Sequence, residues 1–344
     1  RRPGDRSLTW PPPKPRRRHF LGISLGRPLF LLVALAVPSA AAPDLSADAL
    51  LRDHLWREVR LAAPERRPKV GLVLSAGSLR GVAHVGVIKV LTDAGFPVDV
   101  VAGTSMGAVI GAGYAGGLSL QRLWDIASTT DIGSGNNLSA HSFISLILYD
   151  QLLSSENTEK RINRELGGMR FEQTKKPFAC VAMDIYTGEA IIFRDGELAP
   201  AVRASMNLPG IFRPLEYRHR YLVDGGVVDY IPVDAAHLLG AEWTLASVTE
   251  TDFTTARPKN VLDSLEQVID IRGAYLSREQ RKQADFLIEP QVGDISIFDA
   301  KRVPEALEKG VISASRRILA AEESLILASI PRLAGAWMAA EPTR

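Results

Sequence analysis

The sequence predicts an α/β fold with a mostly parallel sheet, and three observations carry this prediction. Two short apolar runs rich in β-branched residues, at 69–75 and 98–102, are typical of buried parallel strands. Each is followed by a turn of small residues and then by a helix-compatible run, which is the order expected of consecutive strand–helix units. The chain has 344 residues, of which 46% are hydrophobic and 23% charged, enough for a large core.

The other elements are predicted from the same hydrophobic patterns. An amphipathic helix is expected within 44–62, and Pro64 and Pro68 separate it from the first strand. We interpret an apolar stretch at 143–149 as a core helix, with a lid or a membrane-touching surface as the alternative. Further helices are expected at 82–95, 106–117, 120–128, 157–166, 198–208, 233–239, 260–283 and 301–329, and further strands at 177–184, 190–194, 221–223, 242–248 and 285–289.

The first 42 residues differ from the rest of the chain in charge. They contain eight Lys and Arg and one Asp, a net charge of +7, whereas the remainder has 33 basic and 38 acidic residues, a net charge of −5. Arg17 and Arg18 precede an apolar core at 29–37 that is too short to span a bilayer, and small residues follow at 39–42. This order predicts a twin-arginine-like export signal, with a fortuitous leader as the alternative. We therefore expect an exported protein, periplasmic or secreted.

The composition also bounds the domain organisation and the partners. Cys180 is the single cysteine and lies in an apolar run, which excludes an intrachain disulfide and a multi-cysteine metal site. The acidic body lacks the basic character of nucleic-acid binding proteins, so we expect no nucleic-acid partner. We also expect no metal and no cofactor.

The expected parts are the export signal at 1–42, an N-terminal helix and linker at 43–68, a catalytic domain at 69–290 and a C-terminal helical appendage at 291–344.

Residues 103–107, Gly-Thr-Ser-Met-Gly, form a G-x-S-x-G pattern between a predicted strand and a predicted helix. This context is typical of a nucleophile elbow, in which Gly103 and Gly107 let the strand and helix backbones come close. Ser105 then lies at a helix N-terminus, where free amides and the helix dipole favour a developing negative charge. We predict that Ser105 is a nucleophile; a glycine-rich turn with a solvated serine is the alternative.

A serine nucleophile needs a base, and the histidines are poorly placed to supply one. None of them follows a strand late in the chain, where α/β-hydrolases with a Ser-His-Asp triad place theirs. A triad enzyme would have to use His219, at an expected hairpin tip formed by Arg218-His219-Arg220, or His237, within a predicted helix.

Asp224 is better placed to act as the base. It follows the strand 221–223 and precedes Gly225 and Gly226, so its carboxylate lies on a tight turn at a strand end. In a doubly wound sheet, this strand end and the one that carries Ser105 can face the same crevice. A carboxylate within hydrogen-bond reach can accept the serine proton directly. The alternative is an ordinary Asp-Gly turn.

The turn after the first predicted strand supplies candidate donors for an oxyanion. Its small residues, beginning at Ala76, present several backbone amides at a helix N-terminus. We expect Gly77, Ser78, Arg80 and Gly81 to form the oxyanion hole, with the Gly77 and Ser78 amides as donors and Arg80 orienting the turn or attracting an anionic substrate. The alternative of a nucleotide phosphate-binding turn is weakened because no Gly-Lys-Ser/Thr follows.

Four segments together resemble the patatin-like phospholipase family. They are 74–86 with the small-residue turn, 103–107 with the elbow, 201–212 with Arg-Ala-Ser and a following Pro, and 223–233 with Asp-Gly-Gly. The resemblance covers roughly residues 69–290. It implies a three-layer α/β/α sandwich, a Ser105–Asp224 dyad without histidine, and hydrolysis of lipid acyl esters.

The chain departs from the family at Ala76 and Ser78, where the family turn normally carries glycine. A Cβ at a position that needs positive φ costs about 1 kcal/mol, which affects the oxyanion geometry. We interpret Ser205 as structural. We expect a phospholipase or lysophospholipase-type esterase with a lipid substrate and peripheral contact with a membrane. The alternatives are a catalytically weak lipid-binding protein and a Ser-His-Asp esterase.

Overall fold

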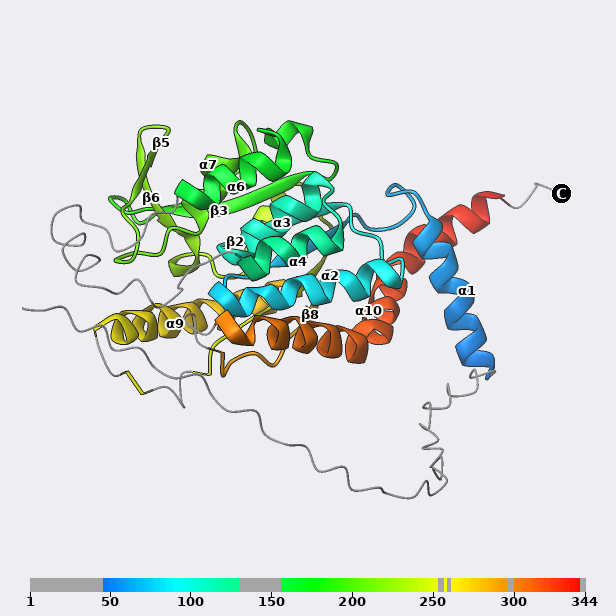
Figure 1. The fold of residues 1–344 in the computed structure, drawn as a ribbon. Helices are drawn as coiled ribbons and strands as arrows, with labels where there is room; N and C mark the ends of the chain where they lie inside the picture. Colours follow the sequence, from blue (N-terminus) through cyan, green and yellow to red (C-terminus); the bar gives the residue numbers. More distant parts are fainter. Residues whose placement is uncertain (1–45, 130–155, 253–256, 259–260, 296–299, 341–344) are drawn as a thin grey trace, which may run out of the picture. The chain divides into compact units, whose positions relative to one another are not determined.

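The computed structural model describes residues 46–129, 156–252, 257–258, 261–295 and 300–340 (Figure 1). The predicted export signal and the apolar stretch at 143–149 lie outside these residues. Within them, no helix is both long enough and apolar enough to cross a membrane.

Within the described residues, eight strands form one sheet, in the order β5-β6-β3-β2-β1-β7-β8, with β4 also paired to β3. Strands β3, β2, β1, β7 and β8 are parallel, whereas β4, β6 and β5 are antiparallel to their partners. The strand bounds are β1 Val70–Leu74, β2 Val100–Thr104, β3 Phe178–Asp184, β4 Ala190–Phe193, β5 Leu215–Tyr217, β6 Arg220–Asp224, β7 Trp243–Ser247 and β8 Phe286–Ile288.

Helices cover both faces of this sheet. Alternate residues of β1 show the two faces: Leu72 and Leu74 belong to one buried cluster, whereas Val73 belongs to another. The first cluster includes residues of α2, α3, α7 and α10, and the second includes α8 and Leu276 of α9. The predicted α/β/α sandwich is therefore confirmed. The helix bounds are α1 Ala47–Leu61, α2 Ala83–Asp93, α3 Met106–Gly116, α4 Leu120–Thr129, α6 Glu156–Leu166, α7 Leu198–Ser205, α8 Val233–Leu238, α9 Val261–Gln280 and α10 Val303–Ala340.

Two elements differ from the predictions. Strand β5 is not among the predicted strands, because it is only three residues long and has charged neighbours. It pairs with β6 across Arg218 and His219, so the hairpin tip expected there is confirmed. Helix α10 continues through Pro331 to Ala340, beyond the expected end at residue 329. A proline usually ends a helix because it removes one backbone hydrogen bond. The other backbone hydrogen bonds of this 38-residue helix are enough for the helix to continue past Pro331.

Helix α10 packs directly against α2, inside one compact unit formed by residues 45–344 (Figure 1). Two glycines allow the close approach. A Cβ at Gly86 would lie 2.3 Å from the carbonyl oxygen of Leu307, and a Cβ at Gly310 would lie 2.1 Å from that of Ala83. The fold thus relies on backbone contact between the helix that follows the oxyanion turn and the C-terminal helix.

We predict that Gly310→Ala destabilises the protein, because the new methyl group collides with backbone that cannot move away cheaply. Overpacking of this kind costs about 1–3 kcal/mol, more than the gain of about 1 kcal/mol in helix propensity. Thermal unfolding measures the effect. Gly335→Ala in the same helix is the control: nothing lies within 4 Å of its Cβ position, so its Tm should hold or rise. An unchanged Tm for Gly310→Ala would contradict the prediction.

Candidate active site

Ser105 lies in the sharp turn between β2 and α3. Its backbone has φ +56° and ψ −123°, a left-handed φ that a serine adopts only under strain. A Cβ at Gly103 would lie 2.3 Å from the carbonyl oxygen of Gly107, and a Cβ at Gly107 would lie 2.3 Å from that of Leu74. Both positions therefore require glycine, which is the property of a nucleophile elbow.

The structure brings Ser105 and Asp224 together. The Ser105 hydroxyl donates a hydrogen bond of 2.5 Å to Oδ2 of Asp224, and the backbone amide of Gly226 donates one of 2.7 Å to Oδ1. Ser105 is 5% exposed and Asp224 2% exposed, so the pair is almost excluded from bulk water. The Ser105 hydroxyl is thus oriented toward Oδ2 of Asp224, which accepts no other hydrogen bond within the described residues.

The route by which the two residues meet differs from the one expected. Strand β6 is antiparallel to β3, so Asp224 does not belong to the parallel edge at which β2 ends. However, the residues of β3 that pair with β6 are the last three, Ala182–Asp184. Asp224 stands opposite Ala182, one residue beyond Val181, which pairs with Thr104. The end of β6 therefore lies beside Ser105 because of its pairing register on β3, and not because β6 runs in the same direction as β2.

Burial raises the pKa of Asp224 to about 7, although the hydrogen bonds from Ser105 and Gly226 oppose this shift. The buried carboxylate has lost its hydration, which favours the protonated form. A carboxyl group with a pKa near neutrality both accepts and returns a proton readily, which suits a general base followed by a general acid.

The Asp-Gly-Gly turn is held against two neighbouring elements. A Cβ at Gly225 would lie 2.4 Å from the carbonyl oxygen of Val181, and a Cβ at Gly226 would lie 2.9 Å from the Cβ of Ala76. The turn therefore lies against both β3 and the start of the predicted oxyanion turn.

The predicted oxyanion turn connects β1 to α2 through a short 3-10 helix at Ser78–Val82. Within the described residues, the amides of Gly77 and Ser78 donate no hydrogen bond and remain available. Ser78 has φ +48°, so the strain expected at the non-glycine positions is present there, whereas Ala76 is not among the residues with positive φ. Gly77 needs glycine for another reason, since a Cβ would lie 2.1 Å from Oγ1 of Thr249.

The other two predicted oxyanion residues are engaged elsewhere. The Gly81 amide donates to the carbonyl oxygen of Gly77 at 3.3 Å. The Arg80 side chain is 1% exposed; it donates to Asp270 at 2.7 Å and to the carbonyl oxygen of Ile295 at 3.1 Å. The role of attracting an anionic substrate does not fit a guanidinium buried in this way, which leaves the role of orienting the turn.

No described histidine lies where it could serve Ser105. His219 is exposed at the far end of β6, roughly 16 Å of extended strand from Asp224. His237 donates a 2.9 Å hydrogen bond from Nδ1 to the carbonyl oxygen of Ala241, near the start of β1. His84 is buried between Ser247 and the carbonyl of Ser75, and burial lowers its pKa to about 4.

The described residues also contain no group of three or more His, Cys, Asp or Glu arranged to hold a metal ion.

Three supporting residues were not identified from the sequence as parts of the site. Ser205, predicted to be structural, accepts a 2.9 Å hydrogen bond from the Ser105 amide and donates one of 2.6 Å to Val181. Thr249 donates to the carbonyl oxygen of Ala76 at 3.1 Å, and the carbonyl of Tyr230 accepts from the Ala76 amide at 2.9 Å. The signal for Thr249 is its position two residues after β7, at the carboxyl end of a parallel strand, where sites in such sheets form.

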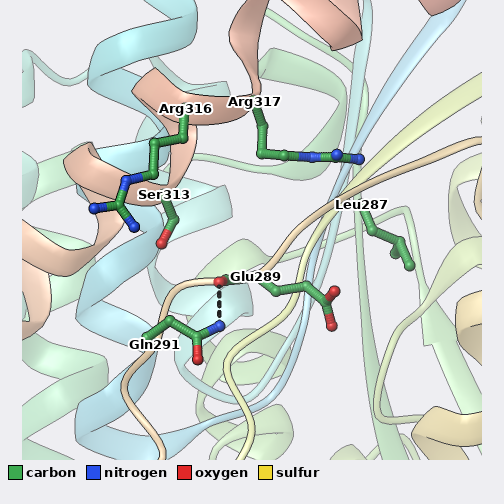
Figure 2. A pocket seen from close by; sticks show the side chains of 6 residues that line it. All are labelled: Leu287, Glu289, Gln291, Ser313, Arg316 and Arg317. Carbon is green, nitrogen blue, oxygen red and sulfur yellow. Dashed lines mark hydrogen bonds between the residues drawn. The ribbon is translucent and has the colours of Figure 1, made fainter.

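A separate cavity of about 430 Å³ lies between the end of β8 and α10 (Figure 2). Its lining contains none of the predicted site residues. The guanidinium groups of Arg316 and Arg317 point in opposite directions (Figure 2), so they do not converge on one ligand. The lining residues are Leu287, Glu289, Gln291, Ser313, Arg316 and Arg317.

The chain is similar in sequence and in fold to known proteins. The chain is 26% identical over 328 residues to an uncharacterized NTE family protein of Mycobacterium tuberculosis, covering 87% of this chain and 55% of that protein. It is 33% identical over 208 residues to mouse patatin-like phospholipase domain-containing protein 6, covering 57% of this chain and 15% of that protein. The crystal structure of VipD from Legionella pneumophila aligns with a TM-score of 0.46 and 14% identity, over 76% of this chain and 68% of that one.

The chain thus spans about half the length of the mycobacterial relative. Residues 72–237 match the family described as Patatin-like phospholipase, and this match includes the turn after β1, the elbow and the Asp-Gly-Gly turn. The chain therefore contains a domain of the patatin-like phospholipase family.

Proposed function

We propose that this protein is a serine hydrolase that cleaves acyl esters of lipids with a Ser105–Asp224 dyad. The observation that carries the proposal is the buried 2.5 Å hydrogen bond from the Ser105 hydroxyl to Asp224. The lipid substrate class is supported by the family match and by a relative named as a patatin-like phospholipase domain-containing protein. The predicted export signal supports a site of action outside the cytoplasm, with peripheral contact at a membrane.

The proposed reaction has two stages. Asp224 accepts the hydroxyl proton while the Ser105 oxygen attacks the ester carbonyl, and the amides of Gly77 and Ser78 hold the resulting oxyanion. When the tetrahedral intermediate collapses, Asp224 returns the proton to the departing alcohol, leaving an acyl group on Ser105. A water molecule then attacks the acyl-enzyme while Asp224 accepts its proton, and Asp224 returns this proton to the Ser105 oxygen as the fatty acid leaves.

The second candidate function is lipid binding with weak catalysis. The strained Ser78, with φ +48°, supports this alternative, because its amide must hold a demanding orientation for the oxyanion. The two candidates make different predictions for turnover but not for lipid binding, so turnover separates them.

We predict that the wild-type protein releases fatty acid from a panel of phospholipids, lysophospholipids and simple esters, and reacts with a fluorophosphonate probe. Ser105→Ala should lower turnover by about 10³-fold or more and abolish labelling, because no other group replaces the nucleophile. Ser329→Ala, which removes a buried hydroxyl bonded only within α10, is the control and should retain labelling. Labelling that persists in Ser105→Ala would refute the assignment, and wild-type liposome binding without turnover would favour the lipid-binding alternative.

The pH dependence of kcat/KM on a neutral ester gives a second prediction. The carboxylate form of Asp224 is the active form, and its fraction rises with pH through a pKa of about 7. The rate should therefore rise between about pH 6 and pH 8, whereas an unperturbed Asp would already be ionised near pH 4. A rate that is flat from pH 5 to pH 8 would contradict the role of Asp224.

We predict that Ser205→Ala lowers kcat by about 10- to 100-fold with little change in KM. The substitution leaves the Ser105 amide and the Val181 carbonyl without their partner, so the strained elbow can relax and move the hydroxyl away from Asp224. Steady-state kinetics at a temperature where the variant is folded measures the effect. Ser329→Ala serves again as the control, and equal kcat values for the two variants would show that Ser205 is only structural.

A further inference from the structure

A buried ion pair joins the predicted oxyanion turn to helix α9. The Nη2 atom of Arg80 lies 2.7 Å from Oδ1 of Asp270, and the two side chains are 1% and 11% exposed. A second Arg80 nitrogen donates to the carbonyl oxygen of Ile295 at 3.1 Å. Arg80 is two residues from Ser78, whose amide is one of the proposed oxyanion donors.

The turn is anchored differently on the two sides of Ser78. On its N-terminal side, Ala76 is bonded to the backbone of Tyr230 and to the hydroxyl of Thr249. On its C-terminal side, the Gly81 amide bonds back to Gly77 within the turn itself. Besides packing contacts, the Arg80 side chain bonds this side of the turn to two other segments of the described chain, α9 through Asp270 and the backbone at Ile295. Ser78 needs such an anchor because its φ of +48° is a strained conformation.

Helix α9 is held firmly enough to act as that anchor. Leu265 and Ile269 pack on a buried cluster around Phe212, and a Cβ at Gly273 would lie 2.7 Å from the ring of Tyr230. At its C-terminal end, Oε1 of Gln280 accepts hydrogen bonds of 3.0 Å from the amides of Tyr230 and Ile231. The helix is thus bonded to the segment that follows Asp224 as well as to the oxyanion turn.

We propose that Asp270 is a positioning residue, which acts through Arg80 to hold the Gly77 and Ser78 amides in the orientation that binds the oxyanion. This inference rests on the proposed hydrolase function and deepens it. If Asp270 is replaced, the Arg80 guanidinium is left as a buried charge without its partner, which costs free energy. The guanidinium then shifts toward water or another acceptor, and the backbone of the turn shifts as well. The oxyanion forms only as the transition state is approached, so the loss should fall on kcat rather than on KM.

The test compares Asp270→Asn with a matched variant at the opposite end of the sheet. Asp99, before β2, pairs with Arg67 at 2.6 Å, and the Arg67 and Asp99 side chains are 6% and 14% exposed, close to the values for Arg80 and Asp270. Asp270→Asn should lower kcat on a soluble ester by about 10- to 100-fold with KM within about twofold of wild type. Asp99→Asn should lower Tm to a similar extent and leave kcat unchanged. Equal kcat values for the two variants would overturn the proposal.

A second variant guards against simple loss of folding. Arg80→Met combined with Asp270→Leu removes both charges and keeps an apolar contact, a replacement that often preserves stability. We expect a folded protein by thermal melting whose kcat stays as low as that of Asp270→Asn. Recovery of wild-type kcat in this double variant would assign the pair to stability alone and overturn the proposal. A wild-type protein that releases no fatty acid would instead refute the hydrolase function itself, and the inference with it.

Discussion

The hydrogen bond between Ser105 and Asp224 is the interaction on which the site depends. It joins the ends of two strands that run in opposite directions and buries a carboxyl group almost completely. A buried carboxyl is expensive unless its oxygens are bonded, and here the Ser105 hydroxyl and the Gly226 amide each satisfy one oxygen. The same burial that raises the pKa of Asp224 to about 7 also makes it a base suited to neutral pH.

Close backbone packing brings the motifs together around this bond. Gly107 lies against the end of β1, Gly225 against β3, and Gly226 against Ala76, in each case at distances that leave no space for a Cβ. Gly81 makes a similar approach, because a Cβ there would lie 2.7 Å from the side chain of Met106, the residue after Ser105. Glycine in these motifs is thus a requirement of tertiary contact, and only some positions also need an unusual φ.

The strained residues of the site are held by side chains from distant parts of the chain. Ser105 has a left-handed φ and its amide is bonded to Ser205, which is 100 residues away in sequence. Ser78 has a left-handed φ and lies in a turn tied by Arg80 to Asp270, 190 residues further along the chain. Strain at a functional site persists only where the surroundings over-determine it, and these long-range bonds supply that constraint.

The sequence by itself determined the order of the strands and helices in the parallel half of the sheet, because their apolar runs and small-residue turns are local patterns. It also singled out Ser105 and Asp224 as candidates, through the G-x-S-x-G pattern and the Asp-Gly-Gly turn. It did not predict β5, whose three residues carry no periodic signal, or the burial of Arg80, because a basic residue beside a turn looks solvent-exposed until its partner is known. Only the tertiary structure decided how Asp224 reaches Ser105, since strand direction and register arise from pairing between segments far apart in the chain.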